Sequence, residues 1–293
     1  MNTPKIGTVS AIRSTLATVI GERIERLTPT DRRIARSLLD DPGAVAFGTA
    51  ASFAERVGAG VGSVHRLAVQ LGYSGFSNLQ EHVQQEISQR LRPAAEKIKT
   101  TTHGDSVDLA LRSETYNIAQ TLNDVDRLTL SLTVKLLADK TVRIFIVGGN
   151  SSTGVALHFS EELRLLRSDV NLLVGNPVAL STQLALANKN DVLVVIDFHR
   201  YDRWLVDLAK QAVDSGLVLV SIADSVLAPF VSSASCHFTV SARSETPFDS
   251  HVGTLALCSL LVGSVAKSLR RAASRRLDAV EGGWKRGDYL TAT

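Results

Sequence analysis

Cysteine is scarce in this sequence, and the residues present do not form a metal-binding pattern. Cys236 and Cys258 are the only cysteines among 293 residues, and neither has a partner at a spacing typical of a metal site. His158, Glu161 and Glu162 have helical spacing, but a lone histidine without a second His or Cys cluster favours a solvated helix face. We therefore expect reduced thiols in a cytosolic protein and no metal site.

The sequence also lacks a secretory signal and an apolar run long enough to span a membrane. Charged residues such as Arg13, Glu22 and Arg23 interrupt the apolar residues near the N-terminus. The longest apolar run, 253–266, is too short to cross a bilayer and predicts a buried helix. We expect a cytoplasmic protein with no membrane partner.

The chain as a whole has almost no excess of positive or negative charge, but its first third has a small positive excess. Lys and Arg total 32 against 29 Asp and Glu, a net charge of +3. Residues 1–92 hold 11 basic and 8 acidic residues, so the whole excess lies there. Ten of the eleven are arginine, whose planar guanidinium suits phosphate, although a small basic excess is also common on solvated helices.

Apolar residues recur at helical spacing through this first third and predict five helices. They are expected at about 12–27, from Thr30 or Pro29 to 41, around Phe53 to Val57, 62–71 and 78–90. Gly58-Ala59-Gly60 forms a tight turn between the third and fourth helices, which is the spacing of a helix-turn-helix. A plain helical hairpin would give the same pattern.

The content of the fourth helix favours DNA recognition over a plain hairpin. Its exposed early positions carry a hydroxyl, a histidine and an arginine but no acid, and these groups bind base edges and phosphates. The candidate DNA-binding residues are Gly62, Ser63, His65, Arg66, Gln70 and Tyr73.

A specific residue pattern runs through these two helices and the turn that follows them. It reads Ala54-x-x-Val57-Gly58 and then Ser63-Val64-His65-Arg66-Leu67-Ala68-x-x-Leu71-Gly72-Tyr73-x-Gly75-Phe76-x-x-Leu79. This pattern resembles the N-terminal domain of the RpiR/MurR family of bacterial transcription regulators. That family usually has serine at the cap of the recognition helix, where we expect Gly62, which an N-cap also tolerates. The resemblance implies double-stranded operator DNA as a partner.

The remaining two thirds alternate between buried strands and helices. A polar stretch at 93–105 predicts a linker, and helices are expected at 106–122 and 126–138. Strands are then predicted at 142–147, 170–174, 192–198, 218–222 and 236–240, and helices between them at 153–166, 177–187, 203–215 and 226–233. This order predicts a five-stranded parallel sheet with helices on both faces, a three-layer α/β sandwich.

The first strand ends in a turn rich in glycine and hydroxyl groups. Gly148 and Gly149 break the strand, and Asn150, Ser151, Ser152 and Thr153 follow where N–H groups at a helix start point outward. Such a turn suits an anion, although an ordinary capped turn would have the same composition.

Residues needed to bind nucleotide cofactors are missing from this turn. Gly149-x-Ser151-x-x-Gly154 has no middle glycine to admit a pyrophosphate, and Asp169 lies at the start of the second strand instead of its end. No Walker lysine follows the loop. We therefore expect neither NAD nor ATP, and no other cofactor.

The loop also carries the pattern of a second family. The sequence from Gly148 to Ala156 is similar to G-x-G-x-S-x-x-v-A, with Asn150 replacing one glycine and Ser152 at the serine position. As a whole, residues 128–267 resemble the SIS (sugar isomerase) domain, a phosphosugar-binding fold that RpiR-type regulators carry behind their helix-turn-helix. The resemblance implies that the first and third strands lie side by side, so that their loops form the ligand crevice.

The loop after the third strand departs from that family. Phosphosugar binders have S-x-S-G-x-T there, whereas this chain has Asp197-Phe198-His199-Arg200-Tyr201-Asp202. His199 and Arg200 can hold an anion by charge, while Asp197 or Asp202 can accept from ligand hydroxyls; an internal ion-pair network that only closes the loop is an equal alternative. The candidate ligand-binding residues are Gly149, Asn150, Ser151, Ser152, Thr153, Asp197, His199, Arg200 and Glu245.

Two functions fit these features. The first is a transcription regulator whose SIS domain senses a small anionic metabolite, a sugar phosphate or a sugar acid. The alternative is a sugar-phosphate aldose–ketose isomerase with Glu245 or His199 as base. The N-terminal third favours the regulator, because an isomerase has no use for it, so we expect no catalytic residues.

If the protein is a transcription regulator, its domain organisation and assembly can also be predicted. We expect a DNA-binding domain at 1–92, a linker with connecting helices at 93–127, the effector domain at 128–270 and a C-terminal helix and tail at 271–293. One helix-turn-helix makes few DNA contacts, so we expect a homodimer or homotetramer, with the 253–266 helix as candidate interface.

Overall fold

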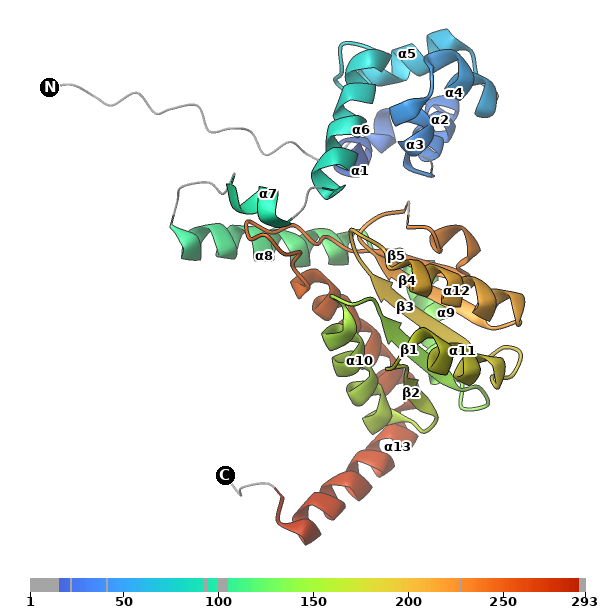
Figure 1. The fold of residues 1–293 in the computed structure, drawn as a ribbon, viewed down its shortest axis with the longest axis vertical. Helices are drawn as coiled ribbons and strands as arrows, with labels where there is room; N and C mark the ends of the chain where they lie inside the picture. The colour runs from blue at the N-terminus through green and yellow to red at the C-terminus, as the bar shows by residue number, and fades with distance from the viewer. Residues whose placement is uncertain are drawn as a thin grey trace, which may run out of the picture. The chain divides into compact units, whose positions relative to one another are not determined.

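The computed structural model divides the chain into two compact units, each with its own hydrophobic core (Figure 1). The first unit is Met1–Leu91 and the second is Arg92–Thr293. The structure describes residues 16–21, 23–40, 42–91, 94–99, 105–226 and 228–289.

The described part of the first unit consists of helices. They are α1 (Leu16–Gly21), a 3-10 helix (Ile24–Arg26), α2 (Pro29–Asp40), α3 (Pro42–Phe47), α4 (Ala50–Arg56), α5 (Val61–Gln70) and α6 (Phe76–Leu91). Side chains such as Ile34, Leu38, Phe53, Leu67 and Leu79 are almost completely buried between them. The predicted all-α helix-turn-helix domain is confirmed.

Three helix predictions in this unit need correction. The helix expected at 12–27 is interrupted after Gly21, a residue with low helix propensity, and its first residues lie outside the described part of the chain. The stop expected at Asp41-Pro42-Gly43 is instead the start of α3, because proline is favoured at the first helical position. Helix α5 begins at Val61 with Gly60 as its N-cap, so Gly62 lies in the first turn and is not the cap.

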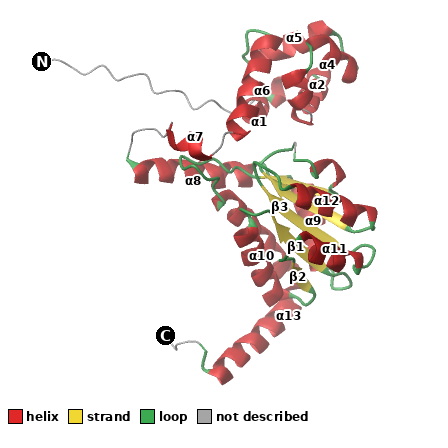
Figure 2. Ribbon diagram, viewed as in Figure 1, coloured by secondary structure: helices red, strands yellow, loops and turns green. Residues whose placement is uncertain are grey.

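The second unit contains a sheet of five parallel strands (Figure 2). The strands are β1 (Ile144–Gly148), β2 (Val170–Leu172), β3 (Val192–Asp197), β4 (Val218–Ala223) and β5 (Cys236–Thr239). Their order is β2-β1-β3-β4-β5, with Val147 of β1 beside Val195 of β3. The strand order therefore reverses between β1 and β3, which confirms that these two strands are neighbours.

Helices cover both faces of this sheet. The described helices of the second unit are α7 (Ala94–Lys99), α8 (Ser106–Asn123), α9 (Arg127–Ala138), α10 (Thr153–Leu166), α11 (Pro177–Ala185), α12 (Arg203–Asp214), a 3-10 helix (Val231–Ser233) and α13 (Val252–Gly287). Ile144 and Ile146 pack with residues of α9, α10 and α13, whereas Phe145 and Val147 pack with α11 and α12 (Figure 1). Strands covered on both faces read as continuous apolar runs. The predicted three-layer sandwich is confirmed.

Two further predictions differ from this structure. The stretch expected as a linker at 93–105 contains α7. The helix expected at 226–233 is reduced to the 3-10 turn Val231–Ser233. Pro229 accounts for this loss, because proline lacks a donor N–H and disfavours helical backbone at the residue before it.

Helix α13 is a core helix in its first half. By length and apolar composition it is the one helix in the described ranges that could cross a membrane. Leu257, Leu261 and Val265 are nevertheless completely buried in the core of their own unit. The 253–266 segment therefore packs its main apolar face against α8, α9 and α10 of its own unit, as expected for a buried helix, and its role as a subunit interface stays a prediction.

Candidate functional site

The turn after β1 requires glycine at two successive positions. A Cβ atom on Gly148 would lie 2.6 Å from the carbonyl oxygen of Ser152, and one on Gly149 would lie 2.1 Å from Oδ1 of Asp197. The turn is therefore tight, and the carboxylate of Asp197 lies directly against the Gly149 backbone.

Asp197 ends β3 and is buried, with 1% of its surface exposed. Its Oδ1 accepts the N–H of Phe198 at 2.9 Å, and its Oδ2 accepts the N–H of Asp202 at 2.9 Å. Burial raises the pKa of Asp197 to about 6, against the lowering effect of these two N–H bonds and with a further increase from Asp202 and Asp224. The buried side chain therefore holds both ends of the β3–α12 loop, residues 198–202, by hydrogen bonds to its backbone.

Two other carboxylates hold the same loop. Asp202 precedes α12 but does not cap it through its side chain; its Oδ2 accepts the N–H of Asn150, in the turn after β1, at 2.7 Å. Asp224 directly follows β4 and accepts the N–H of His199 at 3.1 Å and the Tyr201 hydroxyl at 2.7 Å. His199 has a φ of +62°, a left-handed conformation that is uncommon outside glycine.

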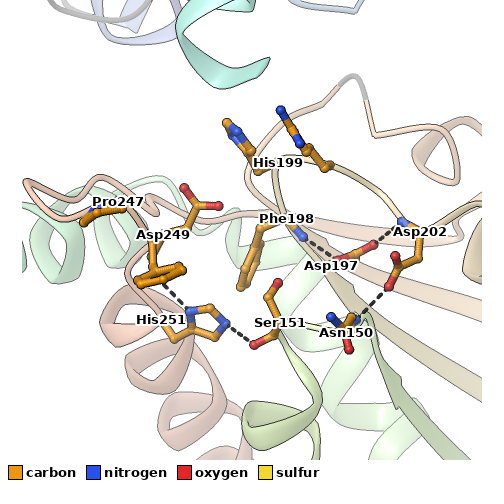
Figure 3. Close-up of a pocket in the computed structure, with 11 residues that line it drawn as sticks. Asn150, Ser151, Asp197, Phe198, His199, Asp202, Pro247, Asp249 and His251 are labelled. Atoms are coloured by element: carbon orange, nitrogen blue, oxygen red, sulfur yellow. Dashed lines mark hydrogen bonds between the residues drawn. The ribbon is translucent and has the colours of Figure 1, made fainter. Parts of the chain in front are cut away.

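These loops enclose a pocket at the C-terminal ends of β1 and β3 (Figure 3). Its volume is about 520 Å³, within the range of small-molecule sites. The lining residues are Asn150, Ser151, Asp197, Phe198, His199, Arg200, Asp202, Pro247, Phe248, Asp249 and His251. Figure 3 shows the side chain of His199 at the rim, directed away from Asp197.

The segment before α13 forms the third wall, which the sequence did not predict. His251 directly precedes α13, and its Nε2 lies 2.8 Å from the Ser151 carbonyl oxygen. Its Nδ1 lies 3.2 Å from the Asp249 carbonyl oxygen, and its ring meets the Phe198 ring edge-on at 5.1 Å between centroids. His251 thus connects α13 to both loops. The only available signal was a histidine at the start of a long apolar helix.

Five of the predicted ligand-binding residues line the pocket together. They are Asn150, Ser151, Asp197, His199 and Arg200. This lining does not include Glu245, which is exposed on the segment leading to the third wall.

The other three predicted residues of the β1 turn have internal positions. Gly149 supports Asp197, and the Thr153 hydroxyl donates to the Gly149 carbonyl oxygen at 3.0 Å. Ser152 is completely buried, and its hydroxyl makes no hydrogen bond within the described residues. Those residues also contain no group of three or more His, Cys, Asp or Glu side chains placed to hold a metal ion.

The helix-turn-helix presents several predicted DNA-binding residues on the outer face of α5. Gly62, His65, Arg66 and Gln70 are exposed, and Arg66 Nη2 donates to Ser63 Oγ at 3.0 Å. The turn before α5 contains Gly58 at a φ of +61°, which glycine adopts without strain. The hydroxyl-bearing Ser63 and the guanidinium of Arg66 therefore lie next to each other on one solvent-facing surface.

Two of the predicted DNA-binding residues have packing roles. A Cβ atom on Gly75 would lie 2.7 Å from Cε1 of His65, so this imidazole lies over the Gly75 backbone. Tyr73 packs against the helical core, with its ring 5.3 Å from the ring of His82 and its hydroxyl buried. Arg66 is thus the exposed cationic side chain of α5.

Comparison with protein families identifies both units. Residues 14–90 match the model of the helix-turn-helix domain of the rpiR family, and residues 136–264 match that of the SIS domain. A curated relative from Haemophilus influenzae, named an uncharacterized HTH-type transcriptional regulator, is 25% identical over 215 residues, which cover 72% of this chain and 74% of the relative.

Solved structures share the fold. The Vibrio vulnificus NanR protein complexed with ManNAc-6P is 18% identical, with a TM-score of 0.57 over 95% of this chain and 100% of that one. The sugar isomerase domain of an RpiR transcription factor from Sphaerobacter thermophilus is 22% identical, with a TM-score of 0.58 over 61% of this chain and 99% of that one.

Proposed function

Because this chain belongs to the RpiR family of transcription regulators, with a helix-turn-helix domain followed by a SIS domain, we propose that a small anionic carbohydrate controls its binding to operator DNA. One observation carries the proposal: a pocket of metabolite size lies where the strand order reverses between β1 and β3. Ligands of open parallel sheets bind at this point. The proposal places the protein in the bacterial cytoplasm, where its operator lies.

The lining of the pocket supports an anionic ligand with hydroxyl groups. Arg200 and His199 line the pocket and provide donors, and Arg200 can bind a carboxylate or phosphate with two parallel hydrogen bonds. Asp202 and Asp249 provide acceptors for hydroxyl groups on the same ligand. A sugar phosphate and a sugar acid both have this combination of groups. The NanR protein, which shares the fold, is complexed with a phosphosugar, ManNAc-6P, so a pocket of this fold can hold such a ligand in that protein.

A thermal-shift screen tests the ligand half of the proposal. Wild type and Arg200→Ala are screened against hexose phosphates, hexuronic and aldonic acids, and neutral hexoses. We expect at least one class of anionic sugar, the phosphates or the acids, to raise the melting temperature of wild type, because a ligand that binds the folded state stabilises it, and to lose most of this effect in Arg200→Ala. A response to neutral sugars alone, or an anion response that survives Arg200→Ala, would show that the anion site is wrong.

We also propose a homodimer or higher oligomer that pairs through α8. The exposed apolar residues of this helix are Val107, Leu111, Ile118 and Leu122, which are 74%, 65%, 38% and 37% exposed. Their spacing reads the same in both directions along the helix. When two copies of α8 pack antiparallel about a two-fold axis, Val107 therefore faces Leu122 and Leu111 faces Ile118. This self-complementarity is what a two-fold interface requires, and it favours a second copy of the chain as the partner.

The structure gives the isomerase alternative little support. Glu245, one of the two candidate bases, is exposed and is not part of the pocket lining. The other, His199, points away from the buried end of the pocket (Figure 3). Turnover of a sugar phosphate by the purified protein, lost in Glu245→Gln, would reverse this preference.

A further inference from the structure

We infer that Asp202 sets the ligand class of the pocket by keeping phosphate out of the strand-end loops, so that the effector is a carbohydrate without phosphate, most simply a sugar acid. The inference deepens the proposed function and depends on it for the identity of the site. It rests on the hydrogen bonds of the loop amides and on the position of one carboxylate.

Loop amides are the groups that hold a phosphate at the end of a parallel sheet. Several N–H groups that point into one concave loop form an anion site without any charged side chain. In this chain the N–H groups of Phe198, His199 and Asp202 in the β3–α12 loop all donate to carboxylates of the protein. The N–H of Asn150 across the pocket does the same. An incoming phosphate therefore finds these four donors already bound to anions.

Asp202 differs from the other two carboxylates in this arrangement. Asp197 is buried against Gly149, and Asp224, directly after β4, accepts the Tyr201 hydroxyl of the β3–α12 loop. Asp202 lines the pocket and is only partly buried, and its Oδ2 reaches from one loop to the Asn150 N–H of the other. To accept a hydrogen bond from the Asn150 N–H, a ligand oxygen would have to displace Oδ2 of Asp202 and lie close to the negative charge of this carboxylate. The repulsion is strongest for a phosphate dianion.

The same residue recognises hydroxyl groups. Asp202 lines the pocket, and its side chain does not cap α12. A carboxylate oxygen is a strong acceptor for a sugar hydroxyl. A ligand with hydroxyl groups at Asp202 and a planar carboxylate at Arg200 satisfies both side chains, because one guanidinium pairs with both oxygens and the single charge of a carboxylate, whereas a phosphate has three acceptor oxygens and close to two charges to compensate.

Inorganic phosphate is the probe that tests the inference, measured by isothermal titration calorimetry on the full chain at constant ionic strength. The first variant, Asp202→Ser, frees the Asn150 N–H and places a hydroxyl at the loop. Asp202→Asn keeps an acceptor for that N–H but removes the charge. Asp207→Ser removes an exposed acid from the same helix and serves as the control. Because the Asp202 side chain does not cap α12 and serine is a good N-cap, we expect Asp202→Ser to fold, which a melting curve checks.

We expect Asp202→Ser to bind phosphate saturably and at least about tenfold more tightly than wild type or Asp207→Ser, because it gains an amide donor and loses a repelling charge. Asp202→Asn should bind more weakly than Asp202→Ser. Wild type that binds phosphate as tightly as Asp202→Ser, or a folded Asp202→Ser that does not bind it, would overturn the inference. Equal binding by Asp202→Asn and Asp202→Ser would refute occupation of the Asn150 N–H as the cause.

This test is separate from the test of the proposed function. It uses neither DNA nor an effector, so phosphate exclusion can be refuted while the response to other sugars remains. Conversely, phosphate binding gained by Asp202→Ser would stand even if no sugar altered DNA binding.

Discussion

Asp197 shows how a single side chain shapes the chemistry of the pocket. It replaces a hydroxyl residue of the phosphosugar-binding pattern, and its burial raises its pKa to about 6. At neutral pH the carboxylate is therefore still ionised, and the N–H groups of Phe198 and Asp202 compensate its charge. Gly149 has to be glycine because this carboxylate occupies the space of a Cβ atom. Asp197 thus contacts the backbone of both loops that line the pocket.

At the same scale, Arg66 is the residue we expect to contribute most to DNA binding. Arg66→Ala should weaken binding to DNA selected from a random pool by about 1–3 kcal/mol if its guanidinium binds a guanine with two hydrogen bonds. Arg66→Lys keeps the charge but loses this geometry, so it should lose sequence preference more than affinity. Fluorescence anisotropy titrations measure both quantities.

A matched control comes from the other unit of the chain. Arg275 is exposed on α13, and Arg275→Ala removes the same charge far from α5 in sequence. This variant should bind the selected DNA as wild type does. Unchanged affinity and sequence preference in Arg66→Ala would remove Arg66 from the DNA interface.

The residues of the pocket could be predicted where they follow a strand directly. Asn150 and Ser151 follow β1, and Asp197, His199 and Arg200 end or follow β3, so the rule for parallel sheets located them. His251 was missed because it follows β5 by more than ten residues and reaches the pocket through an irregular segment. Such a segment has no periodicity from which its path can be predicted.

Among the elements, α8 carries the exposed apolar face through which we propose that two copies of the chain pair. Leu111→Asp places a charge in the middle of this face and should convert the oligomer to a monomer, because an unpaired charge cannot be buried there at low cost. Multi-angle light scattering of the full chain measures the mass. Leu128→Asp on α9 is the control, since Leu128 is 69% exposed and Leu111 is 65% exposed. A monomeric wild type, or a Leu111→Asp variant with the same mass as wild type, would contradict the pairing.

The elements themselves were largely predictable, and the exceptions have local causes. Strands β1 and β3 are buried on both faces, so each is a continuous run of β-branched and apolar residues. Helices α2 and α10 have clear apolar periodicity and were predicted near their observed ends. The sequence does not predict helix α3, because Pro42 and Gly43 are typical helix breakers, although proline is acceptable at a helix start.

In the whole molecule, ligand-controlled DNA binding requires the pocket and the DNA-binding helix to influence each other. A ligand changes DNA affinity only if it binds the DNA-competent and DNA-incompetent forms of the protein differently. His251 offers one physical route out of the pocket, because it contacts the Ser151 carbonyl oxygen and the Phe198 ring and directly precedes α13. A ligand that moves either loop therefore acts on the start of a 36-residue helix.

The most direct test of this central claim is the affinity of the full chain for its selected operator DNA, measured by fluorescence anisotropy with and without a saturating sugar acid from the thermal-shift screen. We predict that the sugar acid changes the Kd of wild type for DNA by at least about fivefold, the lower end of typical allosteric coupling, and that Arg200→Ala binds the same DNA but does not respond. A sugar acid that stabilises wild type yet leaves its Kd for DNA unchanged, or changes it equally in Arg200→Ala, would contradict the account.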